Sequence, residues 1–364
     1  MPKRTPEDVI RDAAPTARLQ RDLDRLRGEN RELHKGAVAA QERIALLERV
    51  DGAVPRPPRW VVKAPKRGHR GILTLLLSDC HFDEVVNPHE VEGANAYNRD
   101  IAVRRLRTTL DKAVMLSRHY FSGVQYEGFV LLLGGDMLSG AIHEELIETN
   151  QDTVFGSLDF WIDQLIAFVG PLADEFGKVH VAGVVGNHGR RTRKPVAKRR
   201  VRDNLDWLMY RQLAKAFRTD DRLTWQLPES ADTDVPIYDT TIRLTHGDQF
   251  RGGAGIVGML SPIMLGQHRK AQRQQALGKT FDLMALGHWH QYVHGRGVVV
   301  NGSVKGYDEY AYVNNFAYEP PQQAFFLVTP EHGASLAAPI RPADARLEGW
   351  GGAHHGGTRA RRAA

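Results

Sequence analysis

Apolar residues recur with a heptad spacing in the first fifty residues and gather into short runs further along the chain. Between residues 16 and 50, a stretch without proline, the recurring positions are Leu19, Leu23, Leu26, Asn30, Leu33, Ala37, Ala40, Ile44 and Leu47. Steps of four and three, with charged residues between them, predict a long helix whose apolar seam pairs with a second copy. Asn30 occupies a seam position at which a buried Asn favours two parallel strands. Residues 1–50 therefore predict a coiled coil that makes a homodimer. A single solvated helix is the alternative, because Gly28, Gly36 and the seam alanines weaken the pattern.

The rest of the chain divides by composition. Residues 51–70 carry four prolines and many basic residues, which is typical of an extended linker. From residue 71 to about 342, apolar runs alternate with helical stretches, and this alternation predicts a layered α/β domain. The predicted strands are 72–78, 129–133, 179–185, 241–245, 281–286 and 298–300. The predicted helices are 98–119, 144–176 (interrupted near Gly156 and Pro171), 196–217 and 262–277. Residues 343–364 are rich in Gly and basic residues, and we expect a disordered tail.

Five short motifs with metal-binding chemistry follow predicted strands. They are LLLSDCH with Asp79 and His81, LLLGGD with Asp136, VVGNHG with Asn187 and His188, LTHGD with His246, and MALGHWH with His288 and His290. Each motif alone is typical of a turn or a cap. Together they return carboxylate, imidazole and amide groups to the strand ends, where α/β folds place their sites. Such ligands suit Mn, Zn or Fe. In D-x-H and H-x-H, alternate residues of an extended segment would point the same way.

The order D-x-H, G-D, G-N-H, H, G-H-x-H, from Asp79 to His290, resembles that of the calcineurin-like metallophosphoesterases. The abundance of Arg, Ala and Gly is typical of bacterial or phage members. The resemblance implies a four-layer sandwich, in which two β-sheets pack face to face and are flanked by helices. It also implies two divalent metal ions, foremost Mn²⁺ with Zn²⁺, Fe or Mg²⁺ as alternatives. Such a pair activates a water molecule and neutralises charge on phosphoryl oxygens.

The resemblance assigns a role to each motif residue. The first metal would be held by Asp79, His81 and His290, the second by Asn187, His246 and His288, and Asp136 would bridge them. His188 would bind no metal and would stabilise or protonate the leaving-group oxygen. Gly189 departs from the family, which usually has an acidic residue there, and this leaves the orientation of His188 open. Cys80 lies between two ligands and is interpreted as a buried packing residue.

The densest basic run begins two residues after His188. It contains Arg190, Arg191, Arg193, Lys194, Lys198, Arg199, Arg200 and Arg202. Arg190 and Arg191 are candidates for contacting a substrate phosphate, and a solvated loop charge is the alternative. The aromatic residues Tyr307, Tyr310, Tyr312, Phe316 and Tyr318 could stack on bases or could pack the second sheet.

We therefore expect a phosphodiesterase or nuclease that acts on nucleic acid. The alternative is a small-molecule phosphodiesterase, for instance one specific for cyclic nucleotides, or a broad phosphomonoesterase. A non-catalytic coiled-coil binding module is a remoter alternative, which the complete ligand set disfavours. A protein phosphatase is disfavoured because MLSG follows Asp136, without the Arg usual in such enzymes.

Composition bears on the kind of partner that the protein binds and on its expected location. A net charge of +6 favours an anionic partner. A single cysteine excludes an internal disulfide and fits a reducing cytoplasm, the expected location. No stretch approaches the roughly 20 apolar residues of a membrane span, and the amino terminus lacks the apolar run of a signal peptide. We expect no membrane association.

Overall fold

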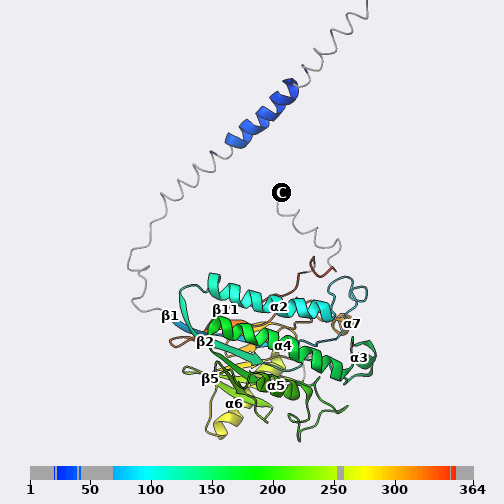
Figure 1. Cartoon of the computed structure of the whole chain (residues 1–364), viewed down its shortest axis with the longest axis vertical. Helices are drawn as coiled ribbons and strands as arrows, with labels where there is room; N and C mark the ends of the chain where they lie inside the picture. The colour runs from blue at the N-terminus through cyan, green and yellow to red at the C-terminus, as the bar shows by residue number, and fades with distance from the viewer. Residues whose placement is uncertain are drawn as a thin grey trace, which may run out of the picture. The chain divides into compact units, whose positions relative to one another are not determined.

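The computed structural model describes residues 20, 23–38, 41, 69–251, 258–344 and 346–349. The chain divides into two compact units, Met1–Lys66 and Arg67–Ala364. In the first unit, residues 23–38 form a helix (Figure 1). Its seam residues Leu23, Leu26 and Leu33 are exposed. The seam positions Leu19, Ala40, Ile44 and Leu47 lie outside the described residues, so the coiled coil and the dimer stay predictions.

The second unit contains a six-stranded sheet. Its order is β11 (Gly333–Ala337), β10 (Phe325–Thr329), β1 (His69–Leu77), β2 (Val124–Leu133), β3 (Val179–Gly183) and β4 (Leu223–Gln226). Strands β1 to β4 run parallel, whereas β10 is antiparallel to both of its neighbours. The carboxyl ends of β1, β2 and β3 consequently meet at one edge.

A five-stranded sheet completes the core of the unit. Its order is β5 (Asp232–Ile237), β6 (Thr240–Thr245), β7 (Leu283–Leu286), β9 (Val298–Val300) and β8 (Val293–Gly295). Strands β6, β7 and β9 are parallel, and β5 and β8 are antiparallel edge strands. The prediction of a mixed α/β fold with two sheets and helices is confirmed.

Helices cover the outer faces of both sheets. The helices are α2 (Arg99–Met115), which continues into a π turn η1 (Leu116–Tyr120), α3 (Glu144–Thr149), α4 (Val154–Phe176), α5 (Leu205–Ala216), α6 (Leu260–Ala276) and α7 (Glu309–Val313). Figure 1 shows α2 and α4 on one side of the sheets and α6 on the other. Within the described part of the chain, every helix is too short or too polar to cross a membrane.

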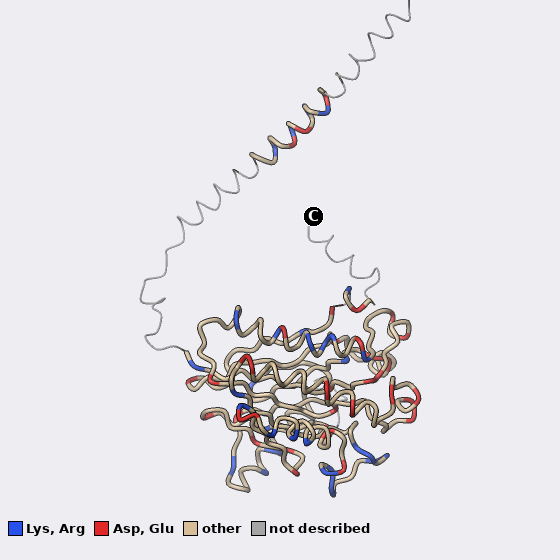
Figure 2. The backbone as a smooth tube through the Cα atoms, viewed as in Figure 1, with Lys and Arg blue, Asp and Glu red and all other residues tan. Residues whose placement is uncertain are grey.

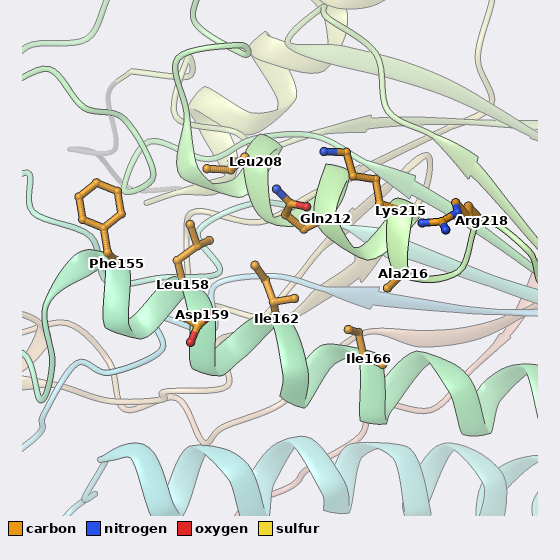
Figure 3. A pocket seen from close by; sticks show the side chains of 10 residues that line it. All are labelled: Phe155, Leu158, Asp159, Ile162, Ile166, Leu208, Gln212, Lys215, Ala216 and Arg218. Atoms are coloured by element: carbon orange, nitrogen blue, oxygen red, sulfur yellow. The ribbon is translucent and has the colours of Figure 1, made fainter.

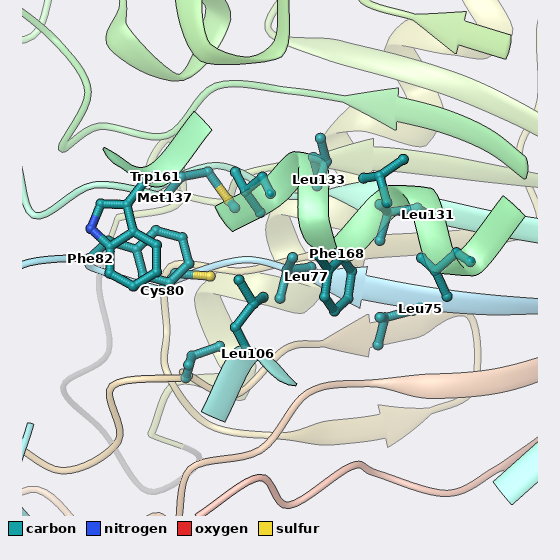
Figure 4. Packing of buried hydrophobic residues seen from close by; sticks show 14 of the residues in the cluster. Leu75, Leu77, Cys80, Phe82, Leu106, Leu131, Leu133, Met137, Trp161 and Phe168 are labelled. Atoms are coloured by element: carbon teal, nitrogen blue, oxygen red, sulfur yellow. The ribbon is translucent and has the colours of Figure 1, made fainter. Parts of the chain in front are cut away.

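Both faces of β1 and β2 are buried, because alternate side chains of each strand pack into two different apolar layers. Leu73, Leu75 and Leu77 point to the helices, where they pack with residues of α2, α4 and α5. Leu76 points the other way, into the layer between the two sheets. Figure 4 shows the helix-side layer, which continues past the strand end to Cys80, buried as predicted. Each fully buried leucine contributes about 1.5–3 kcal/mol, so the ends of these strands are firmly held.

The helix boundaries differ from the predicted ones for local reasons. The break in 144–176 falls at residues 150–153, not at Gly156 or Pro171. Gly156 lies in the first turn of α4, where its N–H is satisfied by the capping hydroxyl of Thr153. Pro171 lies inside α4, which continues because the side chains after it, such as Leu172, are buried. The predicted helix 196–217 begins only at Leu205. The hydrophobic pattern does not predict β4, β5, β8, β10, β11 or α7.

Glu348, in the segment predicted as a tail, packs against the body. Its carboxylate accepts hydrogen bonds from Arg105 Nε at 3.1 Å and from Arg105 Nη2 at 2.8 Å, and the Arg105 side chain is fully buried. The same guanidinium donates to the carbonyls of Val304 and Lys305. The backbone N–H of Val304 donates to the carbonyl of Asp79 at 3.2 Å. The contact between Glu348 and Arg105 therefore supports a loop that lies beside the metal-binding motifs.

We predict that Glu348→Ala lowers the free energy of unfolding by about 3 kcal/mol, because it leaves the Arg105 guanidinium buried without its carboxylate. Leu347→Ala is the matched control, since the Leu347 side chain is exposed and surface changes stay within about 0.5 kcal/mol. Urea denaturation measures both. Equal stability of the two variants would show that Arg105 is satisfied by its carbonyl partners alone.

Candidate metal centre

The residues of the five motifs meet where strands of the two sheets end. Asp79 and His81 follow β1, Asp136 follows β2, Asn187 and His188 follow β3, His246 follows β6, and His288 and His290 follow β7. Each of these five strands runs parallel to a neighbour in its sheet, so the carboxyl ends of the strands lie together. The structure thus brings all of the predicted ligand residues into one cluster.

Three overlapping groups of side chains could each hold a metal ion. In every group, one ligand atom from each residue lies within 4.8 Å of the others; the groups are Asp79, His81 and His290; His81, Asp136 and His188; and Asp136, His246 and His288. In the first, His81 Nε2 lies 3.1 Å from His290 Nε2, which lies 3.5 Å from Asp79 Oδ1. His81 and Asp136 each belong to two groups, and the group that they share also contains His188, for which the resemblance implies no metal. Whether two ions bind stays a prediction.

The donor set around His246 fits a cation. His246 Nδ1 lies 2.8 Å from the carbonyl of Gly134, so the ring proton belongs on Nδ1. Its Nε2 then presents a lone pair 3.0 Å from Asp136 Oδ2 and 3.1 Å from Asn187 Oδ1. Three acceptors converge without a proton between them, an arrangement that a metal ion stabilises. Without a metal, burial opposes protonation of His246, but Asp136 raises its pKa to about 10. In either case the cluster requires positive charge, which supports divalent metal binding.

The other groups are in the protonation states that bind metals. Burial lowers the pKa of His81 and of His288 to about 4, so both imidazoles are neutral at pH 7. Burial opposes ionisation of Asp136, but His246 and His188 hold the pKa of its carboxyl well below the usual range. Neutral imidazole and ionised carboxylate are the ligand forms that a metal ion requires.

Five of the motif residues have left-handed backbone. Their φ values are 52° for Asp79, 45° for His81, 51° for Asp136, 71° for His288 and 53° for His290. The interpretation that alternating residues of an extended segment aim the ligands of D-x-H and H-x-H is therefore wrong, because the chain turns sharply at all four of these ligands. Such backbone costs about 1–3 kcal/mol per residue and persists only where the surroundings enforce it. Its concentration here is typical of a functional site.

Asp206, which no motif marks, holds two of the ligand loops together. Its buried carboxylate accepts from the backbone N–H of Asp136 at 3.0 Å, Met137 at 3.2 Å and Gly186 at 2.9 Å. Burial, with the neighbouring Asp136 adding to it, raises the pKa of Asp206 to about 6. Asp206 lies in the first turn of α5, so this helix positions the loops after β2 and β3.

The ring of His188 is oriented by a backbone carbonyl, since its Nδ1 lies 2.8 Å from the carbonyl of Ser139. The backbone N–H of His188 donates to Asp136 Oδ1 at 2.6 Å. Nε2 is therefore the nitrogen left for a substrate. Close packing explains why a glycine follows His188, since a Cβ on Gly189 would lie 2.3 Å from Asn204 Oδ1. The carbonyl of Ser139 thus does the orienting that an acidic neighbour was expected to do.

The two predicted substrate-binding arginines differ in setting. The Arg190 guanidinium donates to the carbonyls of Asn187, Thr192 and Arg193, so it braces its own loop. Arg191 is exposed and pairs with Asp203 at 3.2 Å. Figure 2 shows basic positions gathered in the loop that precedes α5. Contact of either arginine with substrate stays a prediction.

One groove lies away from the motif residues. It encloses about 540 Å³ between α4 and α5 and is lined by Leu158, Ile162, Ile166 and Leu208, with Phe155 at one end (Figure 3). None of the motif residues lines it. This groove is therefore separate from the candidate metal centre.

Comparisons with known proteins give distant likenesses only. No family model and no curated protein matches the chain. A predicted phosphoesterase from Streptococcus pneumoniae is similar at 11% identity and a TM-score of 0.28, covering 76% of this chain and 98% of that one. Vps29 from Entamoeba histolytica, solved with zinc, matches at 13% and 0.27 over 74% and 99%. The E. coli phosphoesterase Yfce matches at 13% and 0.28 over 74% and 99%.

Yfce is named a phosphoesterase, and the Streptococcus pneumoniae protein is named a predicted phosphoesterase. At TM-scores of 0.27 and 0.28 these likenesses carry no argument about the family or the activity of this chain. The activity proposed below rests on the site residues instead.

We predict that Gly186→Ala weakens Mn²⁺ binding by about 10- to 100-fold, the range for changes in residues that support metal ligands. The new Cβ would lie 2.1 Å from Asp136 Oδ1 and 2.4 Å from Asp136 N, so the bridging residue must move. Gly170→Ala is the control, because its Cβ meets only Phe217 Cε1, at 3.9 Å. Isothermal titration of the metal-free proteins measures the difference. Unchanged affinity in Gly186→Ala would contradict the placement of Asp136 among the ligands.

Proposed function

We propose that this chain is a metal-dependent phosphoesterase that uses two divalent ions, foremost Mn²⁺, to hydrolyse phosphodiester bonds of nucleic acid. The observation that carries the proposal is the buried convergence of carboxylate, imidazole and amide groups from five strand ends. In this assignment Asp79, His81 and His290 hold one ion, Asn187, His246 and His288 hold the other, and Asp136 lies between them. When bound, such ions lower the pKa of a water molecule and neutralise phosphoryl charge.

His188 is the proton donor in this proposal. The Ser139 carbonyl holds its Nδ1, which leaves Nε2 for the leaving-group oxygen. Donation from Nε2 requires the imidazolium form of His188. Burial lowers the pKa of His188 although Asp136 opposes this, so the imidazolium is a stronger acid but a smaller fraction of the ring at neutral pH. The ring centroid lies 4.4 Å from that of His81, which keeps the donor beside the ligand cluster.

We predict that His188→Ala lowers kcat by about 10²-fold or more while leaving the metal content unchanged. The loss should shrink for esters with good leaving groups, which need little protonation. Asp136→Asn is the contrasting variant and should lose both metal and activity. Metal analysis of the purified proteins, with kinetics on a series of phosphodiesters, separates the two roles. Loss of one ion from His188→Ala would make this histidine a ligand.

The basic loop supports nucleic acid as the substrate. Arg191, Arg193 and Arg202 pair with Asp203, Glu144 and Glu229, and all of these side chains are exposed. Exposed pairs contribute about 0–1 kcal/mol, so phosphates can replace the carboxylates. Arg200 differs, because its bidentate pair with Asp248, at 2.7 and 2.8 Å, is partly buried and holds the loop.

The late aromatic residues add to this support. Tyr310, Phe316 and Tyr318 are 67%, 49% and 50% exposed. The alternative that they pack the second sheet is therefore wrong for these three. Exposed rings suit stacking on bases, although the rings of Tyr310 and Phe316 also contact each other, with centroids 5.8 Å apart.

A small phosphodiester is the second candidate substrate. It is favoured because four arginines of the loop already pair with carboxylates of the protein. A small substrate would need the ligand cluster and His188 but not the exposed loop.

We predict that replacing Arg191, Arg193 and Arg202 together with Ala weakens binding of single-stranded DNA. The slope of log K against log salt should flatten by about 2–3 if three phosphate contacts are lost. Hydrolysis of a small chromogenic diester should not change. Arg118→Ala serves as control, since Arg118 forms an exposed pair with Glu175 on other elements. Absence of DNA binding at low salt in the unmodified protein would favour the small substrate.

We also propose that residues 1–50 join two chains. The described helix leaves Leu23, Leu26 and Leu33 exposed, and a lone helix with such a stripe is poorly stable in water. Deleting residues 1–50 should convert a dimer into an active monomer, and Asn30→Leu should tighten association. Light scattering at tens of micromolar protein measures this. A full-length monomer would make the segment a lone arm, and a dimer after the deletion would place the interface in the body.

A further inference from the structure

A chain of buried charges lies behind the metal-binding motifs and belongs to none of them. Glu84, Lys305 and Asp308 are all buried. Lys305 Nζ donates to Glu84 Oε1 at 2.7 Å and also to Asp308 Oδ2. Buried ion pairs of this kind are seldom the most stable solution for a core. A structural role alone gives little reason to place a carboxylate here.

The second oxygen of Glu84 faces His81. Glu84 Oε2 lies 3.3 Å from His81 Nδ1. This nitrogen is buried and has no aligned hydrogen bond among the described residues. A neutral imidazole whose proton points from Nδ1 to Glu84 presents its Nε2 lone pair on the opposite side of the ring. Nε2 is the atom that lies 3.1 Å from His290 Nε2, inside the ligand cluster. A carboxylate behind a ligating histidine fixes its tautomer and raises its basicity.

The same oxygen reaches the support of His188. Ser139 Oγ donates to Glu84 Oε2 at 3.4 Å. The carbonyl of Ser139 is the group that holds His188 Nδ1, at 2.8 Å. A single carboxylate oxygen therefore contacts both a candidate ligand and the residue that orients the candidate proton donor.

We propose that Glu84 is a positioning residue that sets the tautomer of His81 and, through Ser139, the placement of His188. The inference rests on the proposed function and deepens it, because it joins metal binding and proton donation in one hydrogen-bonded unit. Lys305 holds the carboxylate in place from the side away from the ligands. Asp308 accepts from the same ammonium group and has no hydrogen bond to His81 or Ser139.

Glu84→Gln tests this, because it keeps the shape of the side chain and removes its charge. In the full-length protein, Mn²⁺ affinity measured by titration of the metal-free form should fall about 10- to 100-fold. Nitrogen-15 NMR of labelled histidines should show that His81, a single Nδ1–H tautomer in the unmodified protein, becomes a mixture of tautomers in the variant. The kcat should fall most for esters with poor leaving groups, which depend on His188. Asp308→Asn is the control, since it disturbs the same ion-pair chain and should leave the His81 tautomer unchanged.

Two results overturn the proposal. The first is that Glu84→Gln keeps the Mn²⁺ affinity and the His81 tautomer of the unmodified protein. The second is that Asp308→Asn loses Mn²⁺ affinity and the single His81 tautomer to the same extent as Glu84→Gln. If Glu84→Gln does not fold, Ser139→Ala decides through the other contact. It keeps the carbonyl that holds His188 and should lower kcat about fivefold on poor leaving groups with metal affinity unchanged; an unchanged kcat rejects the proposal. Affinity and tautomer need no turnover, so a protein that shows both effects and hydrolyses no ester would refute the proposed function only.

Discussion

The organising constraint of this molecule is a buried set of metal-binding groups that is stable only with added positive charge. The carboxylates of Asp79 and Asp136 are removed from water, and lone pairs of several imidazoles converge on them. An isolated buried carboxylate is very costly. Among the described residues, no lysine or arginine forms an ion pair with Asp79 or Asp136, whose partners are His290 and His246. Lys305 is bound to Glu84 and Asp308. A proton on His246 or a metal ion must therefore supply the charge, and the donor set suits a metal.

The rest of the fold makes that arrangement possible. Strands buried on both faces hold their ends rigidly, and the chain can then turn through left-handed backbone at the ligands. Glycines allow the loops to approach closely, as at Gly287, where a Cβ would lie 2.2 Å from Asp79 Oδ2. Asp206 binds the loops after β2 and β3 to each other. The strain at the ligands is enforced by these contacts and by the packing under the strands.

Sequence reasoning finds the ligands because each one directly follows an apolar strand. The same local signal predicts β1, β2, β3, β6, β7 and β9. It does not find Asp206 or Glu84, whose partners Asp136 and Lys305 are 70 and 221 residues away. It also extends the helix before Leu205 too far. There Arg200 is held by Asp248, and Asn204 caps α5 while its amide donates to Gly186, so tertiary contacts override helical propensity. The side chains that aim the ligands depend on the assembled fold and leave no motif.

The position of metal ions in a crystal of this protein, grown with Mn²⁺ and measured at the manganese absorption edge, tests the two-metal site most directly. Such a site should give two anomalous peaks about 3.5–4 Å apart. One should lie among Asp79, His81 and His290, the other among Asn187, His246 and His288, with Asp136 contacting both. A single peak, or peaks away from Asp136, would contradict the two-metal site on which the proposed activity depends.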